Sequence, residues 1–234
     1  MTTPIDERPA LAMIHTVAGV VPVFNDLVGQ HLPGWRAFNM LDESLLGNTI
    51  REGSLSAQTM RRLATLVWSA RDAGASAVLV TCSSLGPAVD AAAPLCDVPV
   101  FRVDEGMAME AVGRGGRIGV LATLSTTLDP TRRLIQRHAG ARGLSVEIDA
   151  HLCEGAFDKL RSGDAAAHDA LVRDGFASLA DRVDVVVLAQ ASMANALKGV
   201  DGEAIPVLTS PKLGVLHVAS ALNPRTRVPE PAQG

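Results

Sequence analysis

Several residue types on which enzymes commonly rely are scarce or missing in this chain of 234 residues. It contains no tyrosine, and aromatic residues make up only 3% of it. A tyrosine acid or base is therefore excluded, and the few lysines leave little material for Schiff-base chemistry. The 3 cysteines form no CxxC pair, which predicts reduced thiols rather than a disulfide framework or a zinc ribbon. The spacing of the histidines offers no ligand triad, so we predict no metal site.

Long apolar runs and basic stretches are missing as well. No apolar run approaches the ~18 residues that a membrane span needs. The opening residues, MTTPIDERPA, lack the basic start and apolar core of a signal peptide. The formal net charge is −4, and no basic stripe is interleaved with aromatic residues. We therefore expect a cytoplasmic protein that acts on a small molecule, with no nucleic-acid or membrane partner.

The chain is instead rich in small and medium-sized apolar residues, within a hydrophobic content of 47%. Short apolar runs alternate with longer segments of helical period, a pattern typical of βαβ units around parallel sheets. Strands are expected at residues 11–17, 35–41, 75–81, 98–103, 117–123, 145–150, 184–189 and 205–209. Helices are expected at residues 21–31, 56–73, 105–113, 130–141, 165–182 and 211–222, and a loop at 45–53.

Two successive series of four strands predict an α/β fold with two similar lobes. Each lobe is expected to be a mainly parallel sheet flanked by helices, with a cleft between the lobes. We expect the first lobe at residues 1–104, the second at 105–210, and a C-terminal helix with a loosely ordered tail at 211–234. Open parallel sheets bind ligands beyond the carboxyl ends of their strands. Residues that directly follow a strand are therefore the candidates for a functional site.

The most informative of these positions is Cys82, which follows an expected strand within the segment Thr81-Cys82-Ser83-Ser84. The strand places the Cys82 thiol next to three hydroxyl groups at the start of an expected helix. Free backbone N–H groups at such a start favour a thiolate and can also hold a carboxylate. A buried structural cysteine is the alternative, because cysteine packs as a small apolar residue. The position between a parallel strand and a hydroxyl-rich turn favours the functional interpretation.

Further polar residues follow other strands. Thr123, Ser125 and Thr126 belong to a hydroxyl-rich helix start that suits anion binding, although ordinary capping explains one or two of these hydroxyls. Gln190 and Ser192 follow the late strand of the second lobe, and Ser210 follows the last strand. His15 ends the first strand and Glu43 follows the second, so that both are candidates for an acid or base. A structural histidine and a solvated loop carboxylate are the corresponding alternatives.

The order and spacing of these segments resemble the aspartate/glutamate/hydantoin racemase superfamily from about residue 15 to residue 210. The TCSS segment is similar to the Cys-Asn-Thr turn of that family. The segment at 118–127, with Ile-Gly-Val-Leu-Ala-Thr followed by Ser-Thr-Thr, resembles its Gly-Val-x-Ala-Thr-x-x-Thr stretch. The segment at 183–188 is similar to the strand that carries the second cysteine of the family. Single segments are weak signals, and their combination carries the resemblance.

The resemblance implies two lobes around a cleft, with one cysteine from each lobe acting as opposed acid and base without a cofactor. Cys82 matches the first catalytic cysteine. Gln190 stands where the family has the second, and an amide does not exchange protons near neutral pH. Candidates for a replacement acid or base are Cys153, His15 and Glu43. A homodimer is also implied by analogy with the family.

The leading hypothesis is a cofactor-independent isomerase or racemase that acts on a small carboxylate through Cys82. The predicted substrate-binding residues are Thr81, Ser83, Ser84, Thr123, Ser125, Thr126, Gln190, Ser192 and Ser210. A one-cysteine carboxylyase or a cis–trans isomerase, in which Cys82 adds to a double bond, is the first alternative. The second is a small-acid binding protein without turnover.

Overall fold

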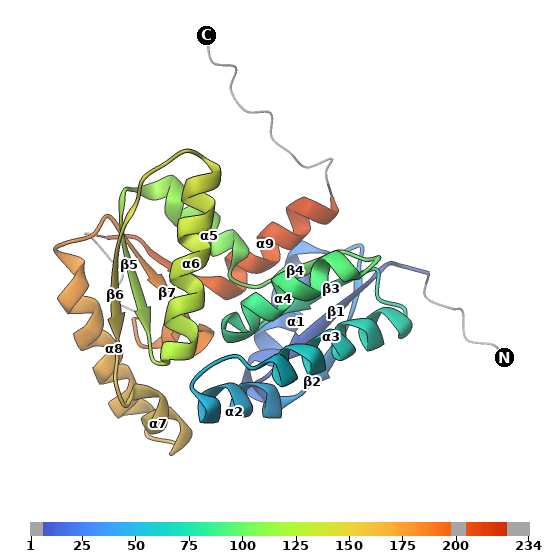
Figure 1. Ribbon diagram of the computed structural model, residues 1–234, viewed down its shortest axis with the longest axis horizontal. Helices are drawn as coiled ribbons and strands as arrows, with labels where there is room; N and C mark the ends of the chain where they lie inside the picture. Colours follow the sequence, from blue (N-terminus) through green and yellow to red (C-terminus); the bar gives the residue numbers. More distant parts are fainter. Residues whose placement is uncertain (1–6, 198–204, 224–234) are drawn as a thin grey trace, which may run out of the picture.

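Two four-stranded parallel sheets form the centre of the molecule, as the computed structural model shows for residues 7–197 and 205–223. The first sheet contains β1 (Ala10–His15), β2 (Arg36–Leu41), β3 (Ala77–Val80) and β4 (Val100–Arg102). The second contains β5 (Arg117–Ala122), β6 (Glu147–Leu152), β7 (Val185–Leu188) and β8 (Val207–Thr209). The strand orders are β2-β1-β3-β4 and β6-β5-β7-β8, and all pairs are parallel. The predicted α/β fold of two similar lobes is confirmed (Figure 1).

Helices cover both faces of the first sheet. Its central strands carry apolar side chains on both sides, and these are buried by packing against the helices. Ala12 and Ile14 of β1 point to the face covered by α3 (Ala57–Asp72) and α4 (Gly86–Ala92). Leu11 and Met13 point to the opposite face, which is covered by α1 (Val21–His31) and α9 (Ser210–Leu222). Strands buried on both faces read as continuous apolar runs, which is why they were predictable.

The second lobe repeats this arrangement. α5 (Glu105–Arg114) and α6 (Ser125–Ala141) pack on one face of its sheet. α8 (Ala165–Ala180) and the short α7 (Ala156–Arg161) contribute to the core on the other face. The short 3-10 helices η1 (Ala18–Val20), η2 (Ser83–Leu85), η3 (Ala93–Leu95) and η4 (Ala191–Asn195) follow or link the larger elements.

The last helix, α9, returns from the end of β8 to the first lobe. Its Val215 and Val218 are buried against the first sheet, and the helix also packs along α1 and α5. A Cβ atom on Gly214 would collide with the carbonyl oxygen of Val103, so glycine allows this close approach. The C-terminal helix expected after residue 210 is thus part of the first lobe's core, whereas the tail at 224–234 lies outside the described residues.

One expected loop is a helix. Residues 45–53 were expected to be irregular, but α2 (Glu43–Glu52) occupies most of that range. The carboxylate of Asp42 caps it by accepting a hydrogen bond from the backbone N–H of Ser44 at 3.0 Å, and Gly53 ends it at a φ of 66°. Both are standard helix-boundary signals. The prediction was wrong because helix start and stop residues were overlooked in a short amphipathic segment.

A buried ion-pair network lies where the two lobes meet. Nε and Nη2 of Arg102 donate to the two carboxylate oxygens of Asp104 at 3.0 and 2.8 Å, and both side chains are almost inaccessible. Nη1 of Arg102 donates to Asp90 at 2.7 Å, and Arg137 of α6 donates to the same Asp90 oxygen at 2.9 Å. Asp90 on α4 therefore ties the first lobe to a helix of the second. A Cβ atom on Gly86 would collide with the Arg102 guanidinium.

Within the described ranges, no helix is long and apolar enough to cross a membrane.

Asp104→Asn is expected to lower the free energy of unfolding by about 3 kcal/mol, because it leaves the buried Arg102 without its bidentate partner. Urea unfolding followed by circular dichroism measures the loss. Asp97→Asn is the matched control, since Asp97 pairs with Arg71 on the exposed surface and its loss is expected to have little effect. Equal effects of the two substitutions would contradict a structural role for the buried network.

Candidate active site in the cleft between the lobes

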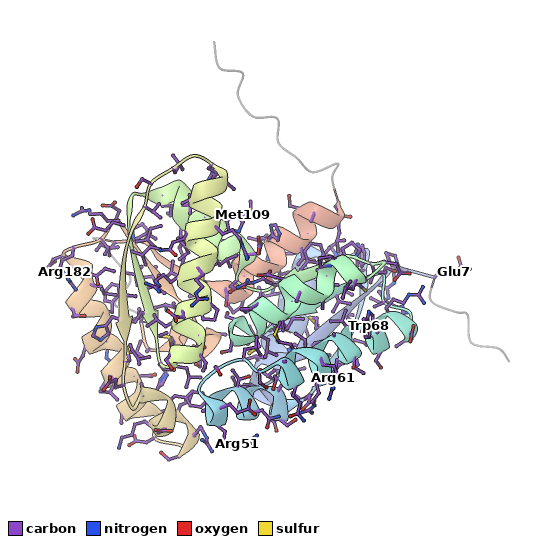
Figure 2. The ribbon with its side chains drawn as sticks, in the orientation of Figure 1. Glu7, Arg51, Arg61, Trp68, Met109 and Arg182 are labelled. Atoms are coloured by element: carbon purple, nitrogen blue, oxygen red, sulfur yellow. The ribbon has the colours of Figure 1, made fainter. Side chains whose placement is uncertain are left out.

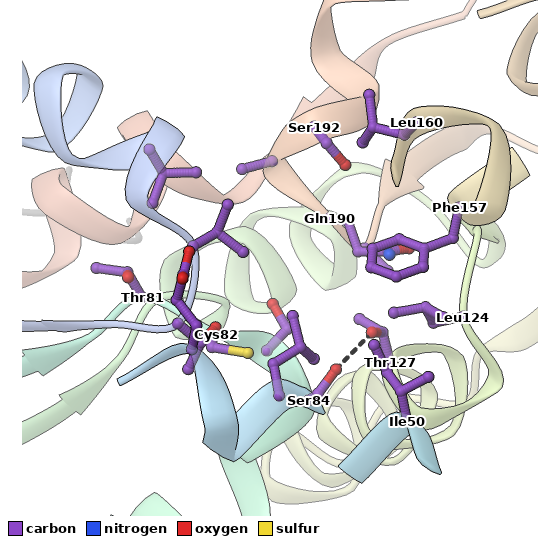
Figure 3. A pocket seen from close by; sticks show the side chains of 18 of the residues that line it. Ile50, Thr81, Cys82, Ser84, Leu124, Thr127, Phe157, Leu160, Gln190 and Ser192 are labelled. Atoms are coloured by element: carbon purple, nitrogen blue, oxygen red, sulfur yellow. Dashed lines mark hydrogen bonds between the residues drawn. The ribbon is translucent and has the colours of Figure 1, made fainter. Parts of the chain in front are cut away.

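A cleft of about 780 Å³ lies between the carboxyl ends of the two sheets. Both lobes contribute to its walls, and Figure 3 shows Cys82 and Gln190 among the side chains that line it. The predicted site residues that line it are Glu43, Thr81, Cys82, Ser83, Ser84, Gln190, Ser192 and Ser210. Those absent from its lining are His15, Thr123, Ser125, Thr126 and Cys153.

Cys82 sits between the end of β3 and the start of η2. The residue is half-buried at the cleft wall, and burial raises the pKa of its thiol above the usual value. Hydrogen bonds from the Thr16 side chain and from the backbone of Ser84 and Leu85 act in the opposite direction, and the Asp104 carboxylate adds to the increase. The backbone groups that we expected to favour a thiolate are thus present, but burial outweighs them. The net effect favours the protonated thiol, which can donate a proton.

Gln190 occupies the position in the second lobe that corresponds to Cys82 in the first. The register of β1 with β3 pairs Ile14 with Val80, and that of β5 with β7 pairs Leu121 with Leu188. Two residues further along each strand pair, Thr16 lies beside Cys82 and Thr123 beside Gln190. Both Cys82 and Gln190 directly precede a 3-10 helix.

The Gln190 side chain is held in place by Thr123. Its Oε1 accepts a hydrogen bond from the backbone N–H of Thr123 at 2.7 Å, and its Nε2 donates to the Thr123 hydroxyl at 2.8 Å. An amide carries a second N–H on the same nitrogen, which is available to a ligand. Gln190 can therefore orient a polar group of a substrate, whereas Thr123 acts through Gln190 instead of lining the cleft.

Of the three candidates for a second acid or base, only Glu43 lines the cleft. It is the first residue of α2, and its Oε1 lies 3.4 Å from the backbone nitrogen of Ala18. Cys153 lies in the core of the second lobe, where its Sγ faces Gly175. Burial raises the pKa of Cys153 to about 11, and the nearby Asp174 adds to this increase.

His15 lies behind Thr81, away from the cleft lining. Its Nε2 is 2.9 Å from Asn39 Oδ1, and its Nδ1 is 2.9 Å from the Thr81 hydroxyl. Asn39 donates its own N–H to Asn25, so the Asn39 oxygen faces His15 and accepts from Nε2–H. Burial lowers the pKa of His15, which favours the neutral ring with Nδ1 as an acceptor. The Thr81 hydroxyl lies 2.9 Å from Nδ1 and 3.2 Å from the carbonyl oxygen of Ile14, so its single proton can go to either acceptor. His15 thus positions the Thr81 side chain.

Two of the remaining predicted hydroxyls, on Ser125 and Thr126, do not line the cleft either. Ser125 is exposed at the start of α6, and the buried Thr126 hydroxyl has no hydrogen-bond partner among the described residues. Thr127, one position further, does line the cleft. Its hydroxyl lies 2.6 Å from that of Ser84, and this buried contact joins the two lobes (Figure 3). Sequence reasoning recognised the hydroxyl-rich segment but did not select Thr127 from it.

Other lining residues were missed altogether. Thr16 follows β1 and contacts the Cys82 thiol, a role that its place after a strand could have suggested. Leu46, Ile50 and Arg51 come from α2, and Phe157, Leu160 and Arg161 come from α7. Neither helix was among those expected from the sequence. The described residues contain no group of three or more histidine, cysteine or acidic side chains that could hold a metal ion.

The fold and the cleft define a class of two-lobed α/β proteins with a site between parallel sheets. The Asp/Glu/hydantoin racemase family matches residues 14–218, and the chain belongs to this family. The resemblance seen in the sequence is therefore confirmed. Comparison with curated protein sequences finds no match.

Solved structures of racemases have the same fold. Glutamate racemase isoform RacE1 from Bacillus anthracis has a TM-score of 0.73 at 17% identity, covering 94% of this chain and 84% of that one. Glutamate racemase from Thermus thermophilus, solved with beta-chloro-D-alanine, has a TM-score of 0.72 at 19% identity, covering 94% and 83%. Allantoin racemase from Klebsiella pneumoniae has a TM-score of 0.63 at 17% identity, covering 93% and 88%.

Thr16→Val is expected to raise the pKa of Cys82 further, because it removes a hydrogen bond that favours the thiolate. The pH midpoint for alkylation of Cys82 by iodoacetamide should rise by about 0.5–1 pH unit. Mass spectrometry of the peptide that contains Cys82 measures the rate at each pH. Thr123→Val is the matched control from the corresponding position of the second lobe, and it should leave the midpoint unchanged. An equal shift in both variants would show that the effect is not local to Cys82.

Proposed function

We propose that the protein is a cofactor-independent isomerase or racemase that acts through Cys82 on a small carboxylate-bearing substrate. The observation that carries this proposal is the position of Cys82 at the end of β3, in a cleft lined by both lobes. Membership of the racemase family supports the reaction class. The hydroxyls of Ser83 and Ser84 beside the thiol support a carboxylate as the group that is bound.

The cleft supplies what proton transfer at a carbon next to a carboxylate requires. Such a proton is too weakly acidic for a free thiolate, so the site must stabilise the carbanion or enolate that forms. Hydroxyl and backbone N–H donors around the bound carboxylate stabilise the charge that develops on its oxygens. Cys82 handles the proton on one face of that carbon: its thiolate accepts it in one direction, and its thiol donates it in the other. Inversion also needs a proton donor or acceptor on the opposite face, and Glu43 is the candidate that lines the cleft.

A second candidate function, a one-cysteine carboxylyase, is favoured by the environment of Gln190. In a two-base racemase, a second group faces the thiol across the substrate, but Gln190 holds the corresponding position and is bound to Thr123. In a carboxylyase the bond to the leaving carbon dioxide breaks, and its electron pair stays on the α-carbon. The Cys82 thiol protonates that carbon, and solvent restores the proton to the sulfur. A cis–trans isomerase would instead use the Cys82 sulfur as a nucleophile.

Cys82→Ser is expected to lower activity by at least about a thousandfold, because a serine hydroxyl is a far weaker acid than a thiol. Amino acids, hydantoins and substituted malonates are incubated with the protein in heavy water. Nuclear magnetic resonance then measures deuterium uptake at the α-carbon and the loss of carbon dioxide. Cys96→Ser is the control, since Cys96 packs in the first core and does not line the cleft. Full turnover by Cys82→Ser would refute the role of Cys82.

Gln190→Cys is expected to add a thiol opposite Cys82 and to increase racemisation relative to one-sided proton exchange by about tenfold or more. Chiral chromatography of the recovered substrate or product measures the enantiomer ratio, and Gln190→Ser serves as the control that removes the amide without adding a thiol. If the natural protein already racemises and loses this ability in Glu43→Gln, then Glu43 is the second base. Unchanged stereochemistry in the active Gln190→Cys variant would contradict the assignment of Gln190 to the opposed position.

A further inference from the structure

The walls of the cleft divide into a polar floor and an apolar side. Hydroxyl, thiol and amide groups gather at the strand ends around Cys82 and Gln190. Val17 and Val20 line the cleft at η1, and a larger group of apolar side chains comes from α2, from the residue before α6 and from α7. The members of this larger group are Leu46, Ile50, Leu124, Phe157 and Leu160. Figure 3 shows Ile50, Leu124 and Phe157 on the opposite side of the pocket from the Cys82 sulfur.

Four of these five side chains are not buried in the protein's interior, and only Leu46 is. None of them belongs to the four clusters that form the cores of the described chain. Ile50, Leu124, Phe157 and Leu160 are only partly buried. Their apolar surfaces gather around one hollow instead of being scattered singly, and such a gathering is typical of a ligand-binding site.

The cleft also has charged lining residues, two of which follow apolar ones on α2 and α7. They are Glu43, Arg51 and Arg161, and all three are exposed to solvent. Arg51 already donates a hydrogen bond to Asn48 at 2.7 Å, and Figure 2 shows it at the outer edge of the molecule. An exposed guanidinium binds an anion only weakly, because solvent screens it. A second carboxylate carried into the apolar part of the cleft would lose its hydration without gaining a buried partner.

The size of the cleft also favours a substrate with a large apolar group. Its volume of about 780 Å³ falls within the ~300–1,000 Å³ that is usual for sites holding drug-sized ligands. A carboxylate head group at the floor occupies a small part of that space. The remainder suits a large side group that contacts α2 of one lobe and α7 of the other at the same time.

We propose that the substrate of this cleft is a carboxylic acid whose α-carbon carries a bulky apolar group, with Ile50 and Phe157 as the main determinants of this specificity. The proposal rests on the function proposed for Cys82 and adds the substrate class. The carboxylate lies at the hydroxyl-lined floor, and the apolar group packs against the five side chains. Each methylene buried there contributes roughly fourfold to the affinity.

The test compares acids that differ only at the α-substituent. Methyl, butyl, benzyl and carboxyethyl members of the amino acid, hydantoin and malonate series are assayed for turnover in heavy water and, separately, for binding by calorimetry. The benzyl or butyl member should exceed the methyl and carboxyethyl members at least tenfold, both in kcat/KM and in affinity. Phe157→Ala and Ile50→Ala should each reduce that preference at least fivefold, and Leu95→Ala, an exposed leucine outside the cleft, should leave it unchanged.

The two proposals fail in distinguishable ways. Tight binding of the benzyl or butyl acids without turnover in any series would refute the enzymatic function and support the ligand class. Turnover that is fastest with the carboxyethyl member would support the function of Cys82 and overturn the apolar substrate. A preference that disappears in Arg161→Gln but persists in Phe157→Ala would also overturn it, since charge would then hold the substituent. Neither turnover nor binding of any member would refute both.

Discussion

The parallel pairing of β1 with β3, and of β5 with β7, is the constraint on which the cleft depends. It brings a threonine beside Cys82 in one sheet and a threonine beside Gln190 in the other. Because the strands are parallel, all four residues emerge at carboxyl ends, where open parallel sheets bind ligands. A one-residue shift in either register would turn alternate side chains toward the opposite face of the sheet and would separate each pair.

The two lobes share an architecture but have different chemistry at equivalent positions. In the first lobe, the strand end presents a thiol whose pKa is raised by burial, and the hydrogen bond from Thr16 partly counteracts this increase. In the second, both polar atoms of the Gln190 amide are bound to Thr123. One side of the cleft can therefore move a proton, and the other can orient a group. This asymmetry separates the chain from a symmetric arrangement of two thiols and makes stereochemistry the most informative property to measure.

Much of the fold was predictable, since strands buried on both faces are continuous apolar runs and the intervening helices are long and periodic. Cys82, Ser84 and Gln190 could be assigned to the cleft because they lie just beyond the carboxyl ends of strands, where open parallel sheets bind ligands. Thr127 and the position of Cys153 could not, because they depend on how helices pack above the sheet. The helix α7 has 6 residues with only Ala156 buried, too few to give a periodic signal, whereas the Asp42 cap and Gly53 made α2 recognisable.

The helices that sequence reasoning missed are those that shape the apolar side of the cleft. α2 belongs to the first lobe and α7 to the second, so a substrate that contacts Ile50 and Phe157 bridges the lobes. The Ser84–Thr127 hydrogen bond and the carboxylate of Asp90 join the same two lobes in the protein itself. A bulky apolar substituent would add a third link at the mouth of the cleft. The same contact that selects the substituent would then also exclude water from the carbon that we propose Cys82 protonates, which would strengthen every hydrogen bond to the developing charge.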